Sequence, residues 1–332
     1  MPAPPVDSFE RKIDYLRLSV TDRCNLRCIY CMPSEGVPRL EHSEILSYEE
    51  IARLAHIVTG MGISKIRVTG GEPLVRKDIL NLCARISRTP GLKSLSITTN
   101  GVMLAEFAEG LWEAGIRRIN ISLDTLQPEK FAAIARRDFF DRVWAGIAAA
   151  EKAGFSPIKL NAVVMRGIND DEIEALAGLT FRHPYHVRFI EFMQFNPGPG
   201  GDYDKKFISS IEILERLRRI APLDLCGDSQ SNGPALHYQF RGAPGKVGII
   251  SPVSNHFCPT CNRLRVTSDG KLRTCLFSAE ETDVRKALRL GLPDDEVAGI
   301  IRRAIAEKPE KHHLENPVFR KCISRQMFSI GG

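Results

Sequence analysis

The sequence predicts an α/β fold, and two observations lead to that prediction. Strand-like and longer helix-like segments alternate between residues 15 and 193. The strand-like segments also alternate apolar and polar side chains, whereas strands covered on both faces are apolar throughout. Strand–helix repetition of this kind predicts a parallel sheet with right-handed crossovers. The expected architecture is therefore an open or partial barrel, or a doubly wound sheet.

Each element is assigned from its local pattern. The predicted strands are Tyr15–Val20, Lys65–Thr69, Ser94–Thr99, Arg118–Leu123, Ile158–Val164 and Val187–Phe192. The predicted helices are Ser47–Met61, Lys77–Ser87, Met103–Ala114, Phe140–Ala153 and Asp170–Phe181. Ser47 and Glu50 have the spacing of a capping box, which starts a helix. Gly115 and Gly154 follow helical runs, where a left-handed C-cap is favoured.

The pattern changes after residue 193, so we expect one domain over residues 1–193 and a C-terminal extension over residues 194–332. The extension is expected to contain a loop at Asn196–Gly201, strands and three helices. The predicted strands are His237–Phe240, Lys246–Ile250, Leu264–Thr267 and Lys271–Thr274, and the predicted helices are Ser209–Ile220, Thr282–Leu290 and Asp294–Glu307. Asp269 and Gly270 form a strong two-residue turn signal between the last two strands.

One face of the predicted sheet is polar and basic. Arg17, Lys65, Arg67 and Lys159 occupy alternating positions on different strands. Two interpretations remain open: a sheet with one face in water, or a polar chamber inside an incomplete barrel. In the second case these side chains would converge on an anionic ligand such as a polyphosphate.

Composition excludes several classes of protein. The chain has 332 residues, of which 43% are hydrophobic and 26% charged, as in an ordinary globular protein. No apolar stretch approaches the ~18 residues that span a bilayer, and charged residues interrupt the N-terminal region, so we expect a cytoplasmic protein. The net charge of +6 is too weak to predict nucleic-acid binding. Nine cysteines, an odd number, argue against a disulfide framework and for metal binding by the two tight clusters.

The first cluster is Cys24, Cys28 and Cys31, spaced C-x3-C-x2-C after the first strand. Three thiolates leave one iron of a 4Fe–4S cluster open to another ligand, whereas zinc sites favour paired ligands. The segment Cys24-Asn-Leu-Arg-Cys28-Ile-Tyr30-Cys31, followed by Gly70-Gly71-Glu72-Pro73 after the second strand, resembles the signatures of radical S-adenosylmethionine (SAM) enzymes. The two glycines are expected to permit close approach of the backbone to the ligand.

The second cluster is Cys258, Cys261 and Cys275. By spacing alone it fits either a zinc site, with His256 as a fourth ligand, or an iron–sulfur cluster. Arg263 and Arg265 share a strand face beside it and are expected to clamp an anion. The stretch from Cys258 to Leu276, the stretch from Arg17 to Pro33 and the Gly331-Gly332 pair together resemble the GTP 3′,8-cyclase family of molybdenum-cofactor biosynthesis. The resemblance covers the chain from about residue 10 onward.

This resemblance implies an incomplete (β/α)6 TIM-like barrel whose open side is closed by a C-terminal α+β extension. It implies two 4Fe–4S clusters, held by Cys24, Cys28 and Cys31 and by Cys258, Cys261 and Cys275. It implies SAM contacts at Tyr30, Gly71, Ser122 and Met193, and GTP contacts at Arg17, Arg67, Thr98, Lys159, Arg263, Arg265, Gly331 and Gly332. Of these, Arg17, Arg263 and Arg265 are the expected catalytic residues.

The implied reaction is a radical cyclisation. A 5′-deoxyadenosyl radical from SAM abstracts hydrogen from C3′ of GTP, and the carbon radical attacks C8 of the same guanine. The product is (8S)-3′,8-cyclo-7,8-dihydroguanosine 5′-triphosphate. The implied partners are GTP, an external electron donor and, by family alone, the next pathway enzyme, cyclic pyranopterin monophosphate synthase. Neither membrane nor nucleic acid is an expected partner, and the oligomeric state is left open between monomer and homodimer.

Two other functions are compatible with parts of the sequence. A peptide-modifying radical SAM enzyme with an auxiliary cluster would keep the chemistry and change the substrate. An iron–sulfur electron carrier or sensor with a nucleic-acid-binding face would not be an enzyme, and it would need fully ligated clusters and an exposed basic stripe.

Overall fold

The computed structural model describes residues 2–37, 40–193, 203–226, 233–312 and 325–331. The predicted loop at Asn196–Gly201, together with Cys322 and Gly332, lies outside these residues. The strands of the described chain are β1 (Tyr15–Ser19), β2 (Lys65–Thr69), β3 (Ser94–Thr99), β4 (Arg118–Ser122), β5 (Lys159–Val164), β6 (His186–Glu191), β7 (Leu223–Leu225), β8 (Ala235–Phe240), β9 (Lys246–Ile250), β10 (Arg263–Val266), β11 (Lys271–Arg273) and β12 (Thr282–Asp283).

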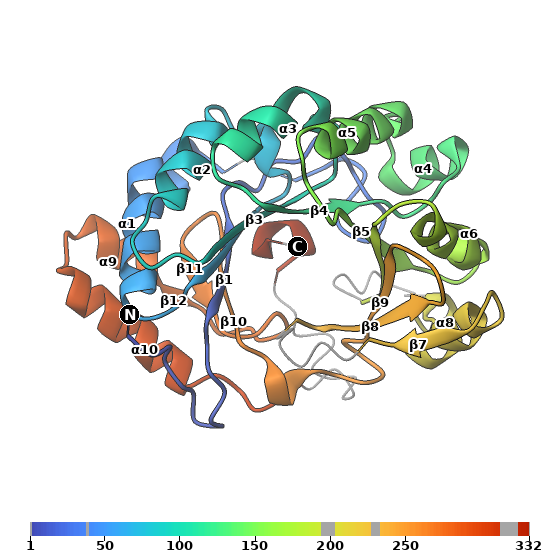
Figure 1. Ribbon diagram of the computed structural model, residues 1–332. Helices are drawn as coiled ribbons and strands as arrows, with labels where there is room; N and C mark the ends of the chain where they lie inside the picture. Colours follow the sequence, from blue (N-terminus) through green and yellow to red (C-terminus); the bar gives the residue numbers. More distant parts are fainter. Residues whose placement is uncertain (1, 38–39, 194–202, 227–232, 313–324, 332) are drawn as a thin grey trace.

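These strands form one sheet in the order β12-β11-β10-β1-β2-β3-β4-β5-β6-β9-β8-β7. Strands β1 to β6 pair in sequence order as parallel neighbours, which confirms the predicted incomplete barrel wall. The C-terminal extension lengthens this wall at both edges, because β10 pairs in parallel with β1 and β9 pairs in parallel with β6. The strands curve around a central space, and the C-terminal end of the chain lies inside it (Figure 1).

Helices cover the outside of the curved sheet (Figure 1). The α-helices are α1 (Tyr48–Gly60), α2 (Ile79–Ser87), α3 (Leu104–Glu113), α4 (Pro128–Ala135), α5 (Phe140–Lys152), α6 (Ile173–Gly178), α7 (Tyr203–Lys206), α8 (Ser210–Arg218), α9 (Val284–Arg289) and α10 (Asp294–Ala306). The 3-10 turns are η1 (His42–Glu44), η2 (Pro73–Val75), η3 (Asp170–Glu172), η4 (Leu179–Phe181), η5 (Cys258–Thr260) and η6 (Met327–Ile330). The capping box is confirmed, since Ser47 and Glu50 exchange side chain–backbone hydrogen bonds of 3.2 and 2.7 Å.

Several elements differ from the prediction, among them the short β7 and α7, which were not predicted. The helix expected at Asp170–Phe181 is split into η3, α6 and η4. Gly178 weakens its second half, and Pro184 closely follows it, so the last turn tightens and the helix ends. Helix α4 was not predicted, because eight residues are too short to show a clear period. The segment expected as a helix from Thr282 begins with the short strand β12, which pairs with β11.

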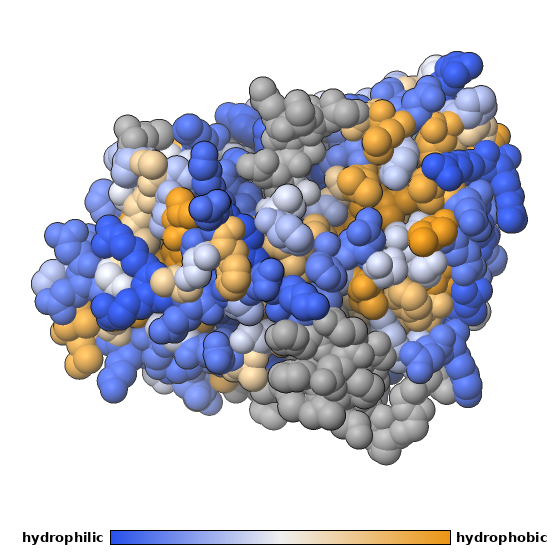
Figure 2. All heavy atoms as spheres, turned by 90° about the horizontal axis from the view of Figure 1, so that it is seen from below, coloured by the Kyte–Doolittle hydropathy of each residue, from blue (hydrophilic) through white to orange (hydrophobic). Residues whose placement is uncertain are grey.

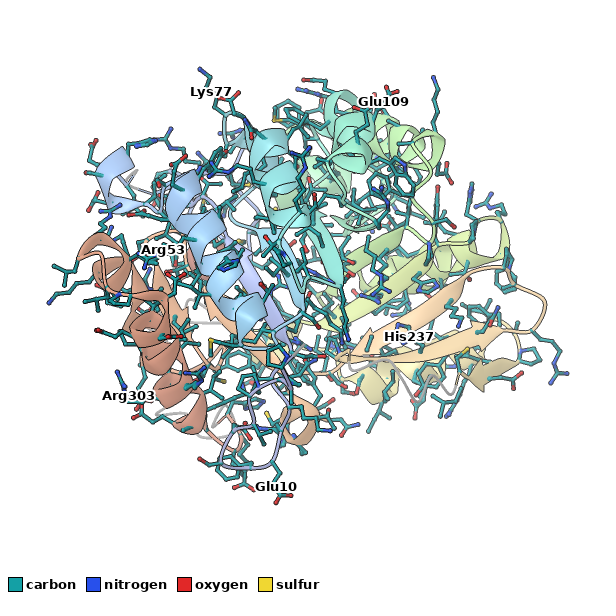
Figure 3. All side chains as sticks on the ribbon, turned by 60° about the vertical axis from the view of Figure 1, so that its left-hand side comes forward. Glu10, Arg53, Lys77, Glu109, His237 and Arg303 are labelled. Carbon is teal, nitrogen blue, oxygen red and sulfur yellow. The ribbon has the colours of Figure 1, made fainter. Side chains whose placement is uncertain are left out.

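The alternating apolar and polar side chains of the strands face two different environments. Leu16, Leu18, Ile66 and Val68 are fully buried under the helices. Their polar neighbours point to the opposite face, toward the inside of the ring. Arg53 and Arg303 lie on the outer helices α1 and α10, outside the sheet (Figure 3). The sheet therefore separates an apolar core outside from a polar chamber inside.

The outer surface is a mixture of charged and apolar residues (Figure 2). The most exposed large apolar side chains are scattered: Ile211 lies on α8, Leu290 follows α9, and Leu225 lies on the edge strand β7. No helix among the described residues has both the length and the apolar character that crossing a bilayer requires.

Candidate active site

The chamber is a cavity of about 450 Å³, within the usual range for small-molecule sites. Cysteines of the first cluster line one part of it, and basic side chains of the strands line another. The predicted site residues that line it are Arg17, Cys24, Cys28, Tyr30, Cys31, Arg67, Gly71, Thr98, Ser122, Lys159, Met193, Arg263 and Arg265. Lys65, predicted to share the polar face, also lines it.

The sheet register explains why the cations converge. In the parallel pairing, Arg17 lies beside Arg67 on one neighbouring strand and beside Arg265 on the other. Tyr15, two residues earlier on the same face, lies between Lys65 and Arg263. Three adjacent strands thus present a block of positive charge. Within it, Lys65 has its own counter-ion, since its ammonium lies 2.7 Å from Asp14.

Burial and mutual repulsion destabilise these charges. Burial, with the positive charge of Arg265 next in importance, holds the pKa of Arg17 well below its usual range. The same causes lower the pKa of Arg265 to about 10, with Arg263 as the repelling neighbour. Burial, then repulsion by Arg188, Arg67 and Arg118, lowers the pKa of Lys159 to about 7. An anionic ligand would relieve this repulsion, so the chamber is suited to a highly charged anion.

The first cysteine cluster lies in the loop after β1. One of its sulfurs receives two hydrogen bonds: Cys24 Sγ accepts from the Leu26 amide at 3.4 Å and from Asn100 Nδ2 at 3.7 Å. Burial raises the pKa of Cys24 to about 11 and that of Cys31 to about 12. The metal-free thiols are therefore protonated at neutral pH, and iron binding must displace those protons. Three thiols on one cavity wall, with N–H groups directed at sulfur, fit an iron–sulfur cluster with one open iron.

The two glycines after β2 also make close contacts within the chain itself. A Cβ at Gly70 would lie 2.7 Å from the carbonyl oxygen of Thr21, and one at Gly71 would lie 2.4 Å from that of Arg23. Glycine is therefore required here for packing against the chain's own cysteine loop, and the close approach to a ligand stays a prediction. The Gly71 amide donates to Thr21 at 2.7 Å, which joins the two segments.

Two buried carboxylates, neither of which was predicted, support this wall of the cavity. Glu72 accepts from the Thr99 hydroxyl at 2.8 Å and from the Asn100 amide at 2.7 Å. Asp124 accepts from the Tyr30 hydroxyl at 2.7 Å and thereby orients that ring. Burial raises the pKa of Glu72 to about 7 and that of Asp124 to about 6.

The second cysteine cluster lies beside the cavity. Cys258, Cys261 and Cys275 do not line it themselves, but their chain neighbours Phe257, Asn262 and Leu276 do. Burial raises the pKa of Cys261, but the positive charges of Lys308 and Arg263 outweigh that effect and lower it overall. The setting of Cys261 favours a thiolate, the form that binds metals, whereas burial raises the pKa of Cys258.

The described part of the C-terminal segment, which ends at Gly331, reaches the basic side chains of the chamber. The carbonyl oxygen of Gly331 accepts hydrogen bonds from Arg17 Nε and Nη2 at 3.2 and 3.1 Å, and from Arg265 Nη1 at 3.2 Å. Met327 and Phe328 line the cavity. Further lining residues that were not predicted include Tyr15, Arg118, Asn161, Arg188 and His237. Arg188 had a signal in the sequence, because it lies between the apolar Val187 and Phe189 on a predicted strand.

Comparisons with known proteins define first the class and then the family. Residues 18–180 match the radical SAM superfamily, and residues 185–314 match the family described as Molybdenum Cofactor Synthesis C. The chain is therefore a radical SAM enzyme, a class that carries a 4Fe–4S cluster and uses SAM.

Its relatives are more specific. The chain is 49% identical to the GTP 3′,8-cyclase of Moorella thermoacetica, over 98% of this chain and 99% of that protein. It is also 49% identical to the GTP 3′,8-cyclase of Heliobacterium modesticaldum, over 93% and 94% of the two chains. The chain belongs to the GTP 3′,8-cyclase family.

A solved structure supports the fold. Streptococcus suis SuiB bound to the precursor peptide SuiA matches with a TM-score of 0.62 at 16% identity, covering 96% of this chain and 75% of SuiB. At this identity the likeness concerns the fold alone.

Proposed function

We propose that this protein converts GTP to (8S)-3′,8-cyclo-7,8-dihydroguanosine 5′-triphosphate, using SAM, in an early step of molybdenum-cofactor biosynthesis. The observation that carries the proposal is that one cavity joins the Cys24, Cys28 and Cys31 loop to the basic strand faces. When bound and reduced, the cluster supplies the electron that cleaves SAM to methionine and the 5′-deoxyadenosyl radical. The protein must hold the ribose of GTP in near-contact with that radical.

The basic residues supply this positioning. Arg17, Arg263 and Arg265 can each bind phosphate oxygens through paired N–H donors. Such pairs orient the triphosphate and also neutralise its negative charge. Arg67, Thr98 and Lys159 line the same cavity and extend the anion site along the sheet. Tyr30, Gly71, Ser122 and Met193 line the cavity as well and are proposed to contact SAM. The carbonyl of Gly331 contributes to substrate placement through Arg17 and Arg265.

We propose a second 4Fe–4S cluster on Cys258, Cys261 and Cys275. The support is the charge around Cys261 and the position of the three residues next to cavity-lining neighbours. Arg11 stabilises the loop by donating to the Cys258 carbonyl at 2.9 Å. In this proposal the cluster binds the guanine end of GTP, while residues 194–332 act as the domain that completes the barrel formed by residues 1–193.

The electrostatics favour this substrate over the alternatives. A wall of buried cations suits a polyphosphate better than a peptide. Nucleic-acid binding would need an exposed basic stripe, whereas Arg17 and Arg265 are buried inside the chamber. An external electron donor, cyclic pyranopterin monophosphate synthase as the next enzyme, a homodimer and a cytoplasmic location remain predictions.

The test is an anaerobic reconstitution with iron and sulfide, followed by addition of dithionite, SAM and GTP. About eight irons, no zinc, 5′-deoxyadenosine and a cyclised GTP product are expected. Replacing Cys258, Cys261 and Cys275 together by serine should leave about four irons. About four irons and one zinc in the unchanged protein, or 5′-deoxyadenosine without cyclised GTP, would contradict the second-cluster or the substrate proposal respectively.

A further inference from the structure

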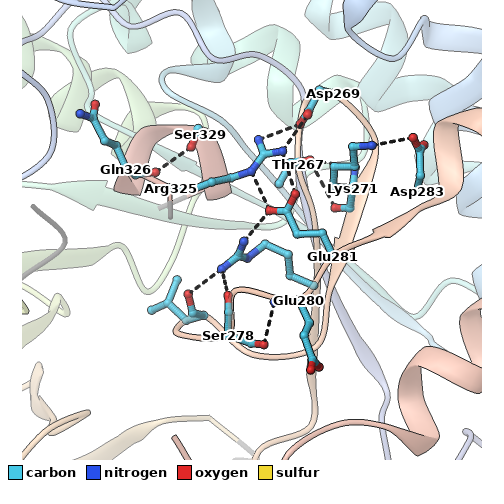
Figure 4. A network of polar contacts seen from close by, with 12 residues as sticks. Thr267, Asp269, Lys271, Ser278, Glu280, Glu281, Asp283, Arg325, Gln326 and Ser329 are labelled. Atoms are coloured by element: carbon cyan, nitrogen blue, oxygen red, sulfur yellow. Dashed lines mark hydrogen bonds and ion pairs between the residues drawn. The ribbon is translucent and has the colours of Figure 1, made fainter. Parts of the chain in front are cut away.

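Arg325 lies between two carboxylates just before the C-terminal turn η6 (Figure 4). Its Nη1 and Nη2 donate to the two Asp269 oxygens at 3.1 and 2.8 Å. Its Nη2 and Nε also contact the two Glu281 oxygens, at 2.9 and 2.6 Å. The three side chains are only 16 to 23% exposed. Such a forked, mostly buried arrangement fixes geometry far better than an exposed ion pair.

The partners of Arg325 lie in residues 258–281, which contain the second cysteine cluster and are called the second cysteine loop below. Asp269 is in the turn between β10 and β11, and Glu281 immediately precedes β12. Glu281 also pairs with the fully buried Arg273, whose guanidinium donates to the Leu276 and Ser278 carbonyls. One carboxylate therefore links the loop that follows Cys275 to the start of the C-terminal segment (Figure 4).

The segment after Arg325 contacts both parts of the chamber. Met327 and Phe328 line the cavity together with Cys31 of the first cysteine cluster. The Gly331 carbonyl accepts from Arg17 and Arg265, as described above. Because only five residues separate Arg325 from Gly331, a fixed Arg325 restricts where that carbonyl can lie.

We propose that Arg325 is a positioning residue that latches the C-terminal segment to the second cysteine loop through Asp269 and Glu281, and so places Gly331 against Arg17 and Arg265. The proposal rests on the function proposed above. Arg325 itself does not contact the substrate. Arg325 acts on substrate placement indirectly, because it fixes the C-terminal segment that contacts Arg17 and Arg265.

The test compares the reconstituted protein with Arg325→Gln and Asp269→Asn variants. Two properties are measured: hydrogen exchange of the 326–331 amides without substrate, and cyclised GTP formed per 5′-deoxyadenosine with SAM and GTP. In both variants we expect about tenfold faster exchange and an about tenfold lower product ratio, with an unchanged iron count. Arg325→Lys keeps the charge but loses the fork that bridges two carboxylates, so it should give an intermediate ratio.

A matched control is available in Arg216→Gln. Arg216 pairs through two nitrogens with Glu174 at 2.8 Å, and its side chain is 20% exposed, but it lies on α8. It should leave exchange of the 326–331 amides and the product ratio unchanged. Should Arg325→Gln fail to fold, Asp269→Asn still decides the question, because it leaves the Arg273–Glu281 pair intact.

The outcomes separate the two proposals. Unchanged exchange in the variants would overturn the latch, and faster exchange with an unchanged product ratio would overturn its role in positioning. If the unaltered protein makes 5′-deoxyadenosine but no cyclised GTP, the proposed function fails, and the exchange measurement still decides whether Arg325 holds the segment.

Discussion

Arg17 donates two hydrogen bonds to the carbonyl oxygen of Gly331, although 314 positions separate these residues in the sequence. Arg265 donates to the same oxygen. A neutral carbonyl is a weak partner for two buried guanidinium groups whose charges repel each other. The contact orients both side chains but does not neutralise their positive charges. A triphosphate would neutralise those charges, so the C-terminal segment and the substrate would both bind to Arg17 and Arg265.

Replacing Arg17, Arg263 or Arg265 singly by alanine should abolish cyclisation while both clusters assemble. Removing a forked donor to phosphate costs charge and orientation together, so we expect at least about a hundredfold loss in kcat/KM for GTP. Product formation and iron content are measured on each variant. Arg85→Ala, which removes an exposed pair with Glu49, is the control and should match the unaltered protein. Unaltered turnover in any of the three chamber variants would exclude that residue from the role.

GTP binding should take up about one proton at pH 8 through Lys159. Its pKa of about 7, caused by burial and then by neighbouring arginines, makes it mostly neutral at that pH. The negative charge of a bound triphosphate raises the pKa, so the amine becomes protonated in the complex. Calorimetry in buffers of different ionisation enthalpy measures the uptake. It should shrink at pH 6, where the amine is already charged, and disappear in Lys159→Met; uptake that persists in this variant would contradict the assignment.

Gly71→Ala should disrupt the first cysteine loop selectively. Its Cβ would lie 2.4 Å from the Arg23 carbonyl oxygen, a contact that only movement of the backbone can relieve. We expect the reconstituted variant to hold about four irons instead of eight, because only the second trio stays intact. Gly178→Ala is the matched control, since a Cβ there meets nothing within 4 Å. Full iron content in Gly71→Ala would show that the loop tolerates the shift.

Local pattern predicted much of this structure, because alternation reports directly on the two faces of a strand. Arg17 between Leu16 and Leu18 placed the arginine on the inner face, and the structure has it there. The pairing of β10 with β1 has no such signal. It joins Arg265 to Arg17 across most of the chain and depends on tertiary packing. The contact of the glycines after β2 with the cysteine loop had no local signal either, because the carbonyl oxygen that excludes a side chain comes from another segment.

Asn100 is a similar case, and its contact with Cys24 leads to a prediction about the first cluster. Asn100 Nδ2 lies 3.7 Å from Cys24 Sγ and 2.7 Å from Asn25 Oδ1, while Glu72 holds the Asn100 backbone. An N–H group directed at sulfur stabilises the more negative, reduced cluster and so raises its reduction potential.

Asn100→Ala should therefore lower the potential of the first cluster. Loss of a hydrogen bond worth about 1 kcal/mol corresponds to about 40 mV for one electron. A redox titration followed by electron paramagnetic resonance measures the shift, and the second cluster serves as an internal reference. Asn81→Ala, at an exposed position of α2, should leave both potentials unchanged. A potential that stays the same in Asn100→Ala would mean that the Leu26 amide alone sets the hydrogen bonding of that sulfur, whereas a shift in both clusters would indicate a general structural change.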